Sequence, residues 1–208
     1  MPAWRSIPRL EPLSLPIETD GGEYNIRVSV FSLTLRSHLI GAVIAVAAVA
    51  ADIPRASPPF TIQRVGATPI QLSQYRGKIV SLTFMSTTCS HCEEFTKILN
   101  VLAKEYTPRG VQFLECAFNS GALAALPSFV QRLKPGYPVG YSSNAAVLQY
   151  LSGTTTDLRP IYIPRVVFLD RNGVIRVDIT GEDNFFQNAE AGMRAQLEKI
   201  LKGSQAKP

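Results

Sequence analysis

The chain has few of the residues that build metal sites and disulfide-rich scaffolds: it holds three cysteines and two histidines among 208 residues. Three cysteines exclude a disulfide-dense fold. A zinc site that uses a Cys-x-x-Cys pair needs a second pair of ligands, and only Cys116, His38 and His91 remain for that purpose. We therefore predict no metal site and no other cofactor.

Dense basic runs and internal repeats are also absent. The formal net charge is +5, with Lys and Arg scattered along the chain, whereas nucleic-acid binding requires a clustered basic patch. Hydrophobic residues make up 46% of the chain and charged residues 18%, which is typical of a globular core. We therefore expect a globular domain with no nucleic-acid partner.

No apolar run reaches the ~20 residues that a membrane-spanning helix needs. The run LIGAVIAVAAVAA covers the 13 residues 39–51, follows Arg36 and ends in small side chains, as does the apolar region of a signal peptide. We interpret residues 1–51 as a leader with a signal peptide or a membrane anchor; a buried core helix is the alternative. A signal or anchor predicts a periplasmic or other extracytoplasmic protein, either secreted or tethered to the membrane through residues 39–51.

The apolar periodicity behind the leader predicts an α/β domain. Prolines favour a linker over residues 52–59, and a folded domain is expected over residues 60–203. Strands are expected over 60–62, 70–72, 79–85, 111–118, 165–169 and 174–179, and helices over 93–106, 127–133, 144–151 and 188–201. A strand–helix–strand unit implies a parallel pair, and Asn172-Gly173 predicts a hairpin. The order predicts a mixed β-sheet covered by helices on both faces.

A Cys-x-x-Cys motif, Cys89-Ser90-His91-Cys92, lies between the strand expected at 79–85 and the helix that follows. The spacing brings both sulfurs into the first helical turn, where unpaired N–H groups and the helix dipole favour a thiolate. We predict that Cys89 and Cys92 form a redox-active disulfide, with Cys89 as the nucleophile and Cys92 as the resolving thiol. A structural bridge or an inert pair is the alternative.

Two further residues near this motif carry open alternatives. His91 is expected to tune the acidity of Cys89, and a solvated loop histidine with little effect is an equal alternative. Cys116 shares a strand face with Leu114 and Phe118 by the two-residue period, which predicts a buried, inert thiol. A third redox cysteine is the alternative for Cys116.

From about residue 60 to residue 201 the chain resembles the thioredoxin fold and, within it, the redoxin branch of thiol-specific antioxidants and exported reductases of cytochrome c maturation. Three motifs carry the resemblance in the right order: L-x-x-x-x-G-K at 72–78, the Cys-x-x-Cys motif, and I-P-R-V-V-F-L-D at 163–170 followed by Asn-Gly. The resemblance implies a thioredoxin-like fold and a cis peptide bond before Pro164. It also implies that substrates bind beside Pro164, Ile163 and Thr88.

The chain departs from thioredoxins at two positions. Thioredoxins carry a Trp just before the first cysteine, where this chain has Thr88, and a buried acid six residues before it, where this chain has Thr83. That acid helps proton transfer, so proton transfer at Cys92 needs water or another group. A His at position 91 resembles periplasmic oxidases, whereas the redoxin-like framework resembles reductants, and both directions stay open.

The resemblance implies an exported thiol–disulfide oxidoreductase that acts on protein substrates and exchanges electrons with a membrane or soluble partner. A peroxiredoxin-like antioxidant peroxidase is one alternative, because Ser86 fits the Thr/Ser position of that family and Arg165 is a well-placed arginine. Against it, Leu82 replaces the family's proline. A redox-inactive module that binds peptides beside Pro164 is the second alternative.

Overall fold

The computed structural model describes residues 53–153 and 160–205, so the apolar run at 39–51 lies outside the described residues. The chain divides into two units, Met1–Ile44 and Ala45–Pro208, and all described residues belong to the second. Within the described ranges, no helix has the length and apolar character needed to cross a membrane.

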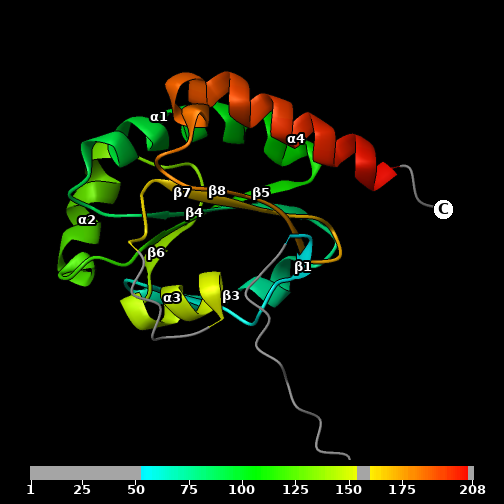
Figure 1. Ribbon diagram of the computed structural model, residues 1–208. Coiled ribbons are helices and arrows are strands. Elements are labelled where there is room, and N and C mark those ends of the chain that lie inside the picture. Colours follow the sequence, from blue (N-terminus) through cyan, green and yellow to red (C-terminus); the bar gives the residue numbers. More distant parts are fainter. Residues whose placement is uncertain (1–52, 154–159, 206–208) are drawn as a thin grey trace, which may run out of the picture. The chain divides into compact units, whose positions relative to one another are not determined.

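In the described part of the chain, eight strands form one mixed sheet with the order β1-β8-β7-β4-β5-β6-β2-β3 (Figure 1). The strands are β1 (Arg55–Ala56), β2 (Thr61–Arg64), β3 (Ala67–Gln71), β4 (Ile79–Met85), β5 (Val111–Ala117), β6 (Val139–Tyr141), β7 (Arg165–Leu169) and β8 (Val174–Ile179). The central strand β4 pairs in parallel with β5 and antiparallel with β7. All seven residues of β4 are buried, because helices cover both faces of the sheet.

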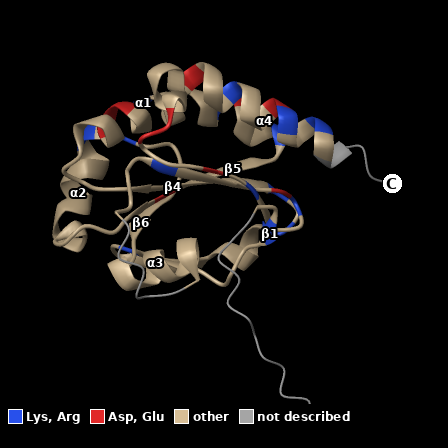
Figure 2. Ribbon diagram, viewed as in Figure 1, with Lys and Arg blue, Asp and Glu red and all other residues tan. Residues whose placement is uncertain are grey.

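Helices α1 (Ser90–Tyr106) and α4 (Ala189–Gln205) cover one face of the sheet, and α3 (Asn144–Ser152) covers the other (Figure 1). Helix α2 (Ala122–Leu133) lies near the end of α1 that carries the cysteines. Short 3-10 turns occur at η1 (Leu72–Tyr75), η2 (Thr107–Arg109) and η3 (Asn184–Asn188). Charged residues run along α1 and α4, whereas α3 has none (Figure 2). This mixed sheet between helices is the thioredoxin-like arrangement expected from the sequence.

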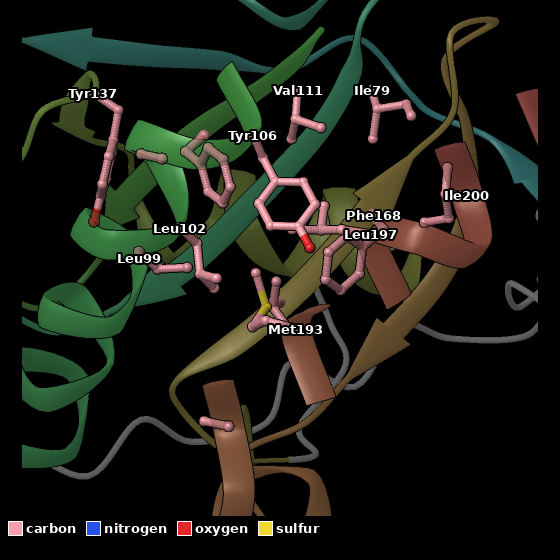
Figure 3. Close-up of a cluster of buried hydrophobic side chains, with 14 of the residues drawn as sticks. Ile79, Leu99, Leu102, Tyr106, Val111, Tyr137, Phe168, Met193, Leu197 and Ile200 are labelled. Carbon is pink, nitrogen blue, oxygen red and sulfur yellow. The ribbon is translucent and has the colours of Figure 1, made fainter. Parts of the chain in front are cut away.

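Helix α1 packs on the sheet through side chains at helical spacing. Phe95, Leu99, Leu102 and Tyr106 are buried, and Figure 3 shows three of them in the cluster that α4 completes. The opposite side of α1 is exposed, and there Lys97 forms an ion pair with Glu94. The helix expected over residues 93–106 is therefore confirmed, and its packing holds the first turn of α1 against the end of β4.

The expected strands and helices are found close to their predicted bounds, except that α2 begins at Ala122, five residues before Pro127. Gly121, at φ +79, precedes the helix and accepts the N–H of Ala125 at 3.1 Å. Alanine-rich sequence then propagates the helix. Pro127 lies inside the helix, where it lacks the N–H that would donate to the carbonyl four residues earlier.

Two short strands had no sequence prediction. Residues 55–56, within the segment 52–59 expected as a linker, pair with β8 as β1, and Arg55 donates to the carbonyl of Tyr150 at 3.0 Å. Strand β6 pairs with β5 and β2. A Cβ at Gly140 of β6 would lie 2.2 Å from the Gln63 carbonyl oxygen, so this pairing needs glycine. Both elements depend on long-range pairing, which period-based analysis does not detect.

Candidate active site

Cys89 caps the first turn of α1. The chain turns after β4, and the N–H of Cys89 donates to the Ser86 carbonyl at 3.2 Å. Cys89 has an extended backbone, with φ −97° and ψ 115°, and its Sγ accepts the N–H of Cys92 at 3.2 Å. This sulfur is half-buried and occupies the N-cap position, at the positive end of the helix dipole.

Cys92 lies behind Cys89, one turn into the helix. It is 1% exposed and packs against Met85 and Ala117. Burial is the main cause that raises the pKa of the Cys92 thiol well above its usual value; the hydrogen bond with Cys89 and the charge of Glu115 act in the same direction. The partly exposed sulfur is thus accessible to a substrate, and the buried sulfur keeps its proton.

The remaining motif residues lie at the surface. His91 and Thr88 are both exposed. Among the described residues, no hydrogen bond joins His91 to the Cys89 sulfur, and the donor there is the backbone of Cys92. The Thr88 hydroxyl lies 3.0 Å from the Ser86 hydroxyl. The polar contact to Cys89 therefore comes from the helix backbone, and the influence of His91 on Cys89 stays a prediction.

The segment at Ile163–Pro164 faces the cysteine pair. Its peptide bond is cis, as the family resemblance implied, and Ile163 packs against the same apolar cluster as Cys89 and Cys92. A Cβ at Gly181 would lie 2.7 Å from the Ile163 backbone, and the Gly181 N–H donates to the Tyr162 carbonyl. The close approach of Gly181 holds this segment in position.

A cleft of about 390 Å³ lies between the start of α1, the Pro164 segment and residues 181–189. Phe95, Ile163 and Phe186 give it apolar walls, and His91 lies on its border. The structure thus brings the predicted residues His91, Ile163 and Pro164 together around one cleft, whose lining does not include Thr88 or either cysteine.

Arg165, the arginine of the peroxidase alternative, does not face the cysteines. Its guanidinium forms two hydrogen bonds to Asp178, at 2.7 and 2.8 Å. Neighbours of Arg165 include Leu148 and Leu151 of α3, which cover the face of the sheet opposite α1. Cys116 also lies on that opposite face, where it is fully buried.

Glu115 is a site residue that the sequence reasoning missed. It lies in β5, is 0% exposed, and accepts hydrogen bonds from Thr96 at 2.8 Å and Tyr137 at 3.2 Å. Burial raises its pKa to about 7, although both hydrogen bonds act in the opposite direction. The available signal was one acid on an otherwise apolar strand face, that of Phe113 and Ala117 by the two-residue period.

Comparison with known proteins finds relatives that are named thiol-disulfide oxidoreductases. The chain is 24% identical over 151 residues to thiol-disulfide oxidoreductase ResA of Bacillus thuringiensis, which covers 73% of this chain and 78% of that protein. It is 28% identical over 125 residues to ResA of Geobacillus kaustophilus, covering 60% of this chain and 67% of that protein.

Solved structures share the fold. A thiol:disulfide interchange protein of the thioredoxin family from Chlorobium tepidum matches with a TM-score of 0.57 and 22% identity, over 73% of this chain and 99% of that chain. The enzyme class expected from the sequence, thiol–disulfide oxidoreductase, is the class that the ResA relatives carry. Residues 53–197, which make up more than half of the chain, match the family model for Redoxin, and the chain therefore belongs to the Redoxin family.

Proposed function

We propose that this chain is an exported thiol–disulfide oxidoreductase that exchanges disulfides with protein substrates through Cys89 and Cys92. One observation carries the proposal: the half-buried Cys89 sulfur caps α1 and accepts the N–H of Cys92, whose own sulfur is buried directly behind it. A substrate can therefore react only with the Cys89 sulfur, and the buried Cys92 sulfur can react only with Cys89. This order of access is what a two-step exchange requires.

In the reducing direction, the Cys89 thiolate attacks one sulfur of a substrate disulfide. A bond forms between Cys89 and the substrate, and the other substrate sulfur leaves as a thiolate. The Cys92 thiolate then attacks the Cys89 sulfur, which breaks the bond to the substrate and forms the Cys89–Cys92 disulfide. The substrate gains two electrons, and a membrane or soluble partner returns two electrons to the pair. In the oxidising direction the same steps run in reverse.

The cleft beside Pro164 is the proposed substrate site. Its apolar walls at Phe95 and Phe186 suit an apolar side chain next to the substrate cysteine. The backbone on either side of Pro164 suits pairing with an extended peptide, a form of strand addition. Thr88 is exposed on the loop before Cys89 and is proposed to border the same substrate.

Export is proposed from the apolar run at 39–51 and the basic Arg36 before it. A leader of this kind delivers the domain to an oxidising compartment, where disulfides are made and kept. Cell fractionation with protein sequencing of the mature N-terminus tests this part: a start shortly after residue 51 in the periplasm means cleavage, and membrane retention of the whole chain means a tether. Recovery of the whole chain in the cytosol would contradict export.

The reduction potential of the cysteine pair tests the exchange mechanism. The full-length protein is equilibrated with glutathione buffers, and the oxidised fraction is measured after thiol trapping. A reversible two-electron transition is expected; a potential near −120 to −180 mV assigns an oxidant or isomerase, and one near −270 mV or lower assigns a reductant. Cys116→Ser should keep the transition, whereas Cys89→Ser should remove it. Absence of any reversible disulfide would refute the proposal.

The peroxidase alternative receives less support from this geometry. A peroxide-reducing site needs an arginine near the attacking sulfur, and Arg165 is held by Asp178 on the opposite side of the sheet. We expect hydrogen peroxide to be consumed no faster by the protein than by a free thiol. Rapid, Cys89-dependent consumption would reverse this order of candidates.

A further inference from the structure

A buried carboxyl group lies beneath the turn that carries Cys92. Glu115 is joined to that turn through one side chain, because the Thr96 hydroxyl lies 2.8 Å from Glu115 Oε1 and 3.0 Å from the carbonyl oxygen of Cys92. The Tyr137 hydroxyl lies 3.2 Å from Glu115 Oε2 and 3.4 Å from the Thr96 carbonyl. Glu115, Thr96 and Tyr137 thus form a polar network between β5 and α1.

An ion pair does not explain why Glu115 is buried. A buried carboxylate is costly unless a cation compensates it, and the nearest elements present none among the described residues. The titratable groups that face Glu115 are Cys92 from α1 and Tyr137 from the segment before β6. In register, β4 presents Thr83 and β6 presents Val139. The network thus contains a single acid, and its ionisable neighbour on the helix is the resolving thiol.

The position of Glu115 corresponds to a displaced family feature. Thioredoxins carry a buried acid at the place of Thr83, and Thr83 is the direct register partner of Glu115 in the parallel pair β4–β5. Partners at one register position point to the same side of a sheet, so both side chains lie under α1. The Thr83 hydroxyl is buried and has no hydrogen-bond partner in the described part of the chain. Glu115 therefore lies on the same face of the sheet as the thioredoxin acid, but on the neighbouring strand.

We propose that Glu115 is the internal base that takes the proton from the Cys92 thiol in the resolution step. This inference rests on the proposed function of the cysteine pair. In the mixed disulfide, the Glu115 carboxylate accepts the proton of Cys92, and the resulting thiolate attacks the Cys89 sulfur. The Cys89–Cys92 bond forms, the bond from Cys89 to the substrate breaks, and the substrate sulfur leaves with the electron pair of that bond. Glu115 then returns its proton to solvent.

The electrostatics are compatible with this role. Burial raises the pKa of Glu115 to about 7, the range in which a general base works best near neutral pH. Burial also keeps the Cys92 proton in place until a base accepts it, since the pKa of this thiol is well above its usual value. The two groups lie close enough for the charge of Glu115 to raise the pKa of Cys92, so the two titrations are linked.

Ellman's disulfide separates the two chemical steps. Attack by Cys89 on 5,5′-dithiobis(2-nitrobenzoate) releases one coloured thiolate, and attack by Cys92 on the mixed disulfide releases the second. In full-length Glu115→Gln, which keeps the shape of the side chain, the second release should slow on the order of 10²-fold at pH 7, while the first is unchanged. The wild-type second rate should level off above about pH 7, whereas in the variant it should keep rising about tenfold per pH unit with the thiolate fraction.

A relocated acid distinguishes proton transfer from packing. The double variant Thr83→Asp with Glu115→Gln puts the acid at the thioredoxin position, and it should recover most of the second rate and its pH plateau. Two results would overturn the role of Glu115. One is a second release in Glu115→Gln with the wild-type rate and pH profile; the other is a double variant that is folded but still slow in the second release. If the wild-type protein itself releases no second thiolate, the exchange by Cys89 and Cys92 fails, which is a different result from failure of the base.

Discussion

The buried positions on the two faces of the central strands β4 and β5 differ in polarity. On the face toward α3 the buried side chains are all apolar, namely Val80, Leu82, Phe84, Leu114 and Cys116, and the polar Gln112 on this face is only half-buried. The face toward α1 carries Ser81, Thr83 and Glu115, all at most 1% exposed, among its apolar residues. Since all these positions except Gln112 are buried, burial does not explain the difference. The buried polar residues of these two strands lie only on the face covered by the helix that carries the cysteines.

The two faces of the sheet therefore have different roles. The α3 face stabilises the fold through close packing, including ring contacts of Phe84 with Phe60 at 5.5 Å and with Tyr150 at 5.6 Å. The α1 face contains a buried acid and two hydroxyls, those of Ser81 and Thr83, that have no hydrogen-bond partner in the described part of the chain, and an unpaired buried polar group costs about 1–3 kcal/mol. Groups of that cost are typical of functional sites. Substitutions on the α1 face are therefore expected to lower activity, and substitutions on the α3 face are expected to lower stability.

The largest expected difference is between two cysteines on opposite faces. Cys89→Ala should abolish turnover of a protein disulfide, because no other accessible sulfur lies at the helix tip. Cys116→Ala should keep turnover and lose only ~1 kcal/mol of unfolding free energy for the small volume removed. Reduction of a disulfide-bonded test protein measures the turnover of both variants. Loss of turnover in a folded Cys116→Ala variant would make Cys116 a third redox residue and remove the functional distinction between the faces.

On the α3 face, Phe84→Ala should lower the free energy of unfolding by about 3–5 kcal/mol, because it empties a fully buried aromatic site. Urea unfolding at fixed pH measures this. A matched control is Val101→Ala on α1, where the side chain is 53% exposed and the expected change is below ~0.5 kcal/mol. Similar losses for both variants would contradict the assignment of Phe84 to the core.

The pH dependence of stability should report the acid on the α1 face. The folded-state pKa of Glu115 is about 7, above its usual value of 4.5. Between these values the folded protein holds a proton that the unfolded chain releases, so stability falls as the pH rises through this window. At ~1.4 kcal/mol per pH unit the total loss is about 3 kcal/mol. Urea unfolding at several pH values should show this fall in the wild type, and Glu115→Gln should lack it; parallel curves would refute the raised pKa.

The smallest effect concerns the Thr83 hydroxyl on the α1 face. Thr83→Val replaces the buried, unpaired hydroxyl with a methyl group of similar size, which should raise the free energy of unfolding by about 1 kcal/mol. Thermal unfolding of both proteins at the same pH measures the change. A loss of stability instead would mean that the Thr83 hydroxyl has a hydrogen-bond partner in solution.

Much of the fold followed from local patterns. The start of α3 is one case, because Ser143 caps it by accepting the N–H of Ala146 at 3.1 Å, as expected of Ser before a helix. The hairpin at Asn172-Gly173 is another, with Gly173 at φ +68. Such features depend on neighbours within a few residues, which the sequence displays directly. The strands β1 and β6 were missed because their partners lie far away in the chain.

The sequence by itself determined the Cys-x-x-Cys motif at the start of α1, the burial of Cys116 and the side chains with which α1 packs. These properties depend on short spacings and on helix or strand periods. Only the tertiary structure decided that Glu115 lies beneath Cys92, beside Thr83, and that Arg165 pairs with Asp178 on the other face. Those contacts depend on strand order and register, which join residues at least 13 positions apart and are set by the packing of the whole sheet.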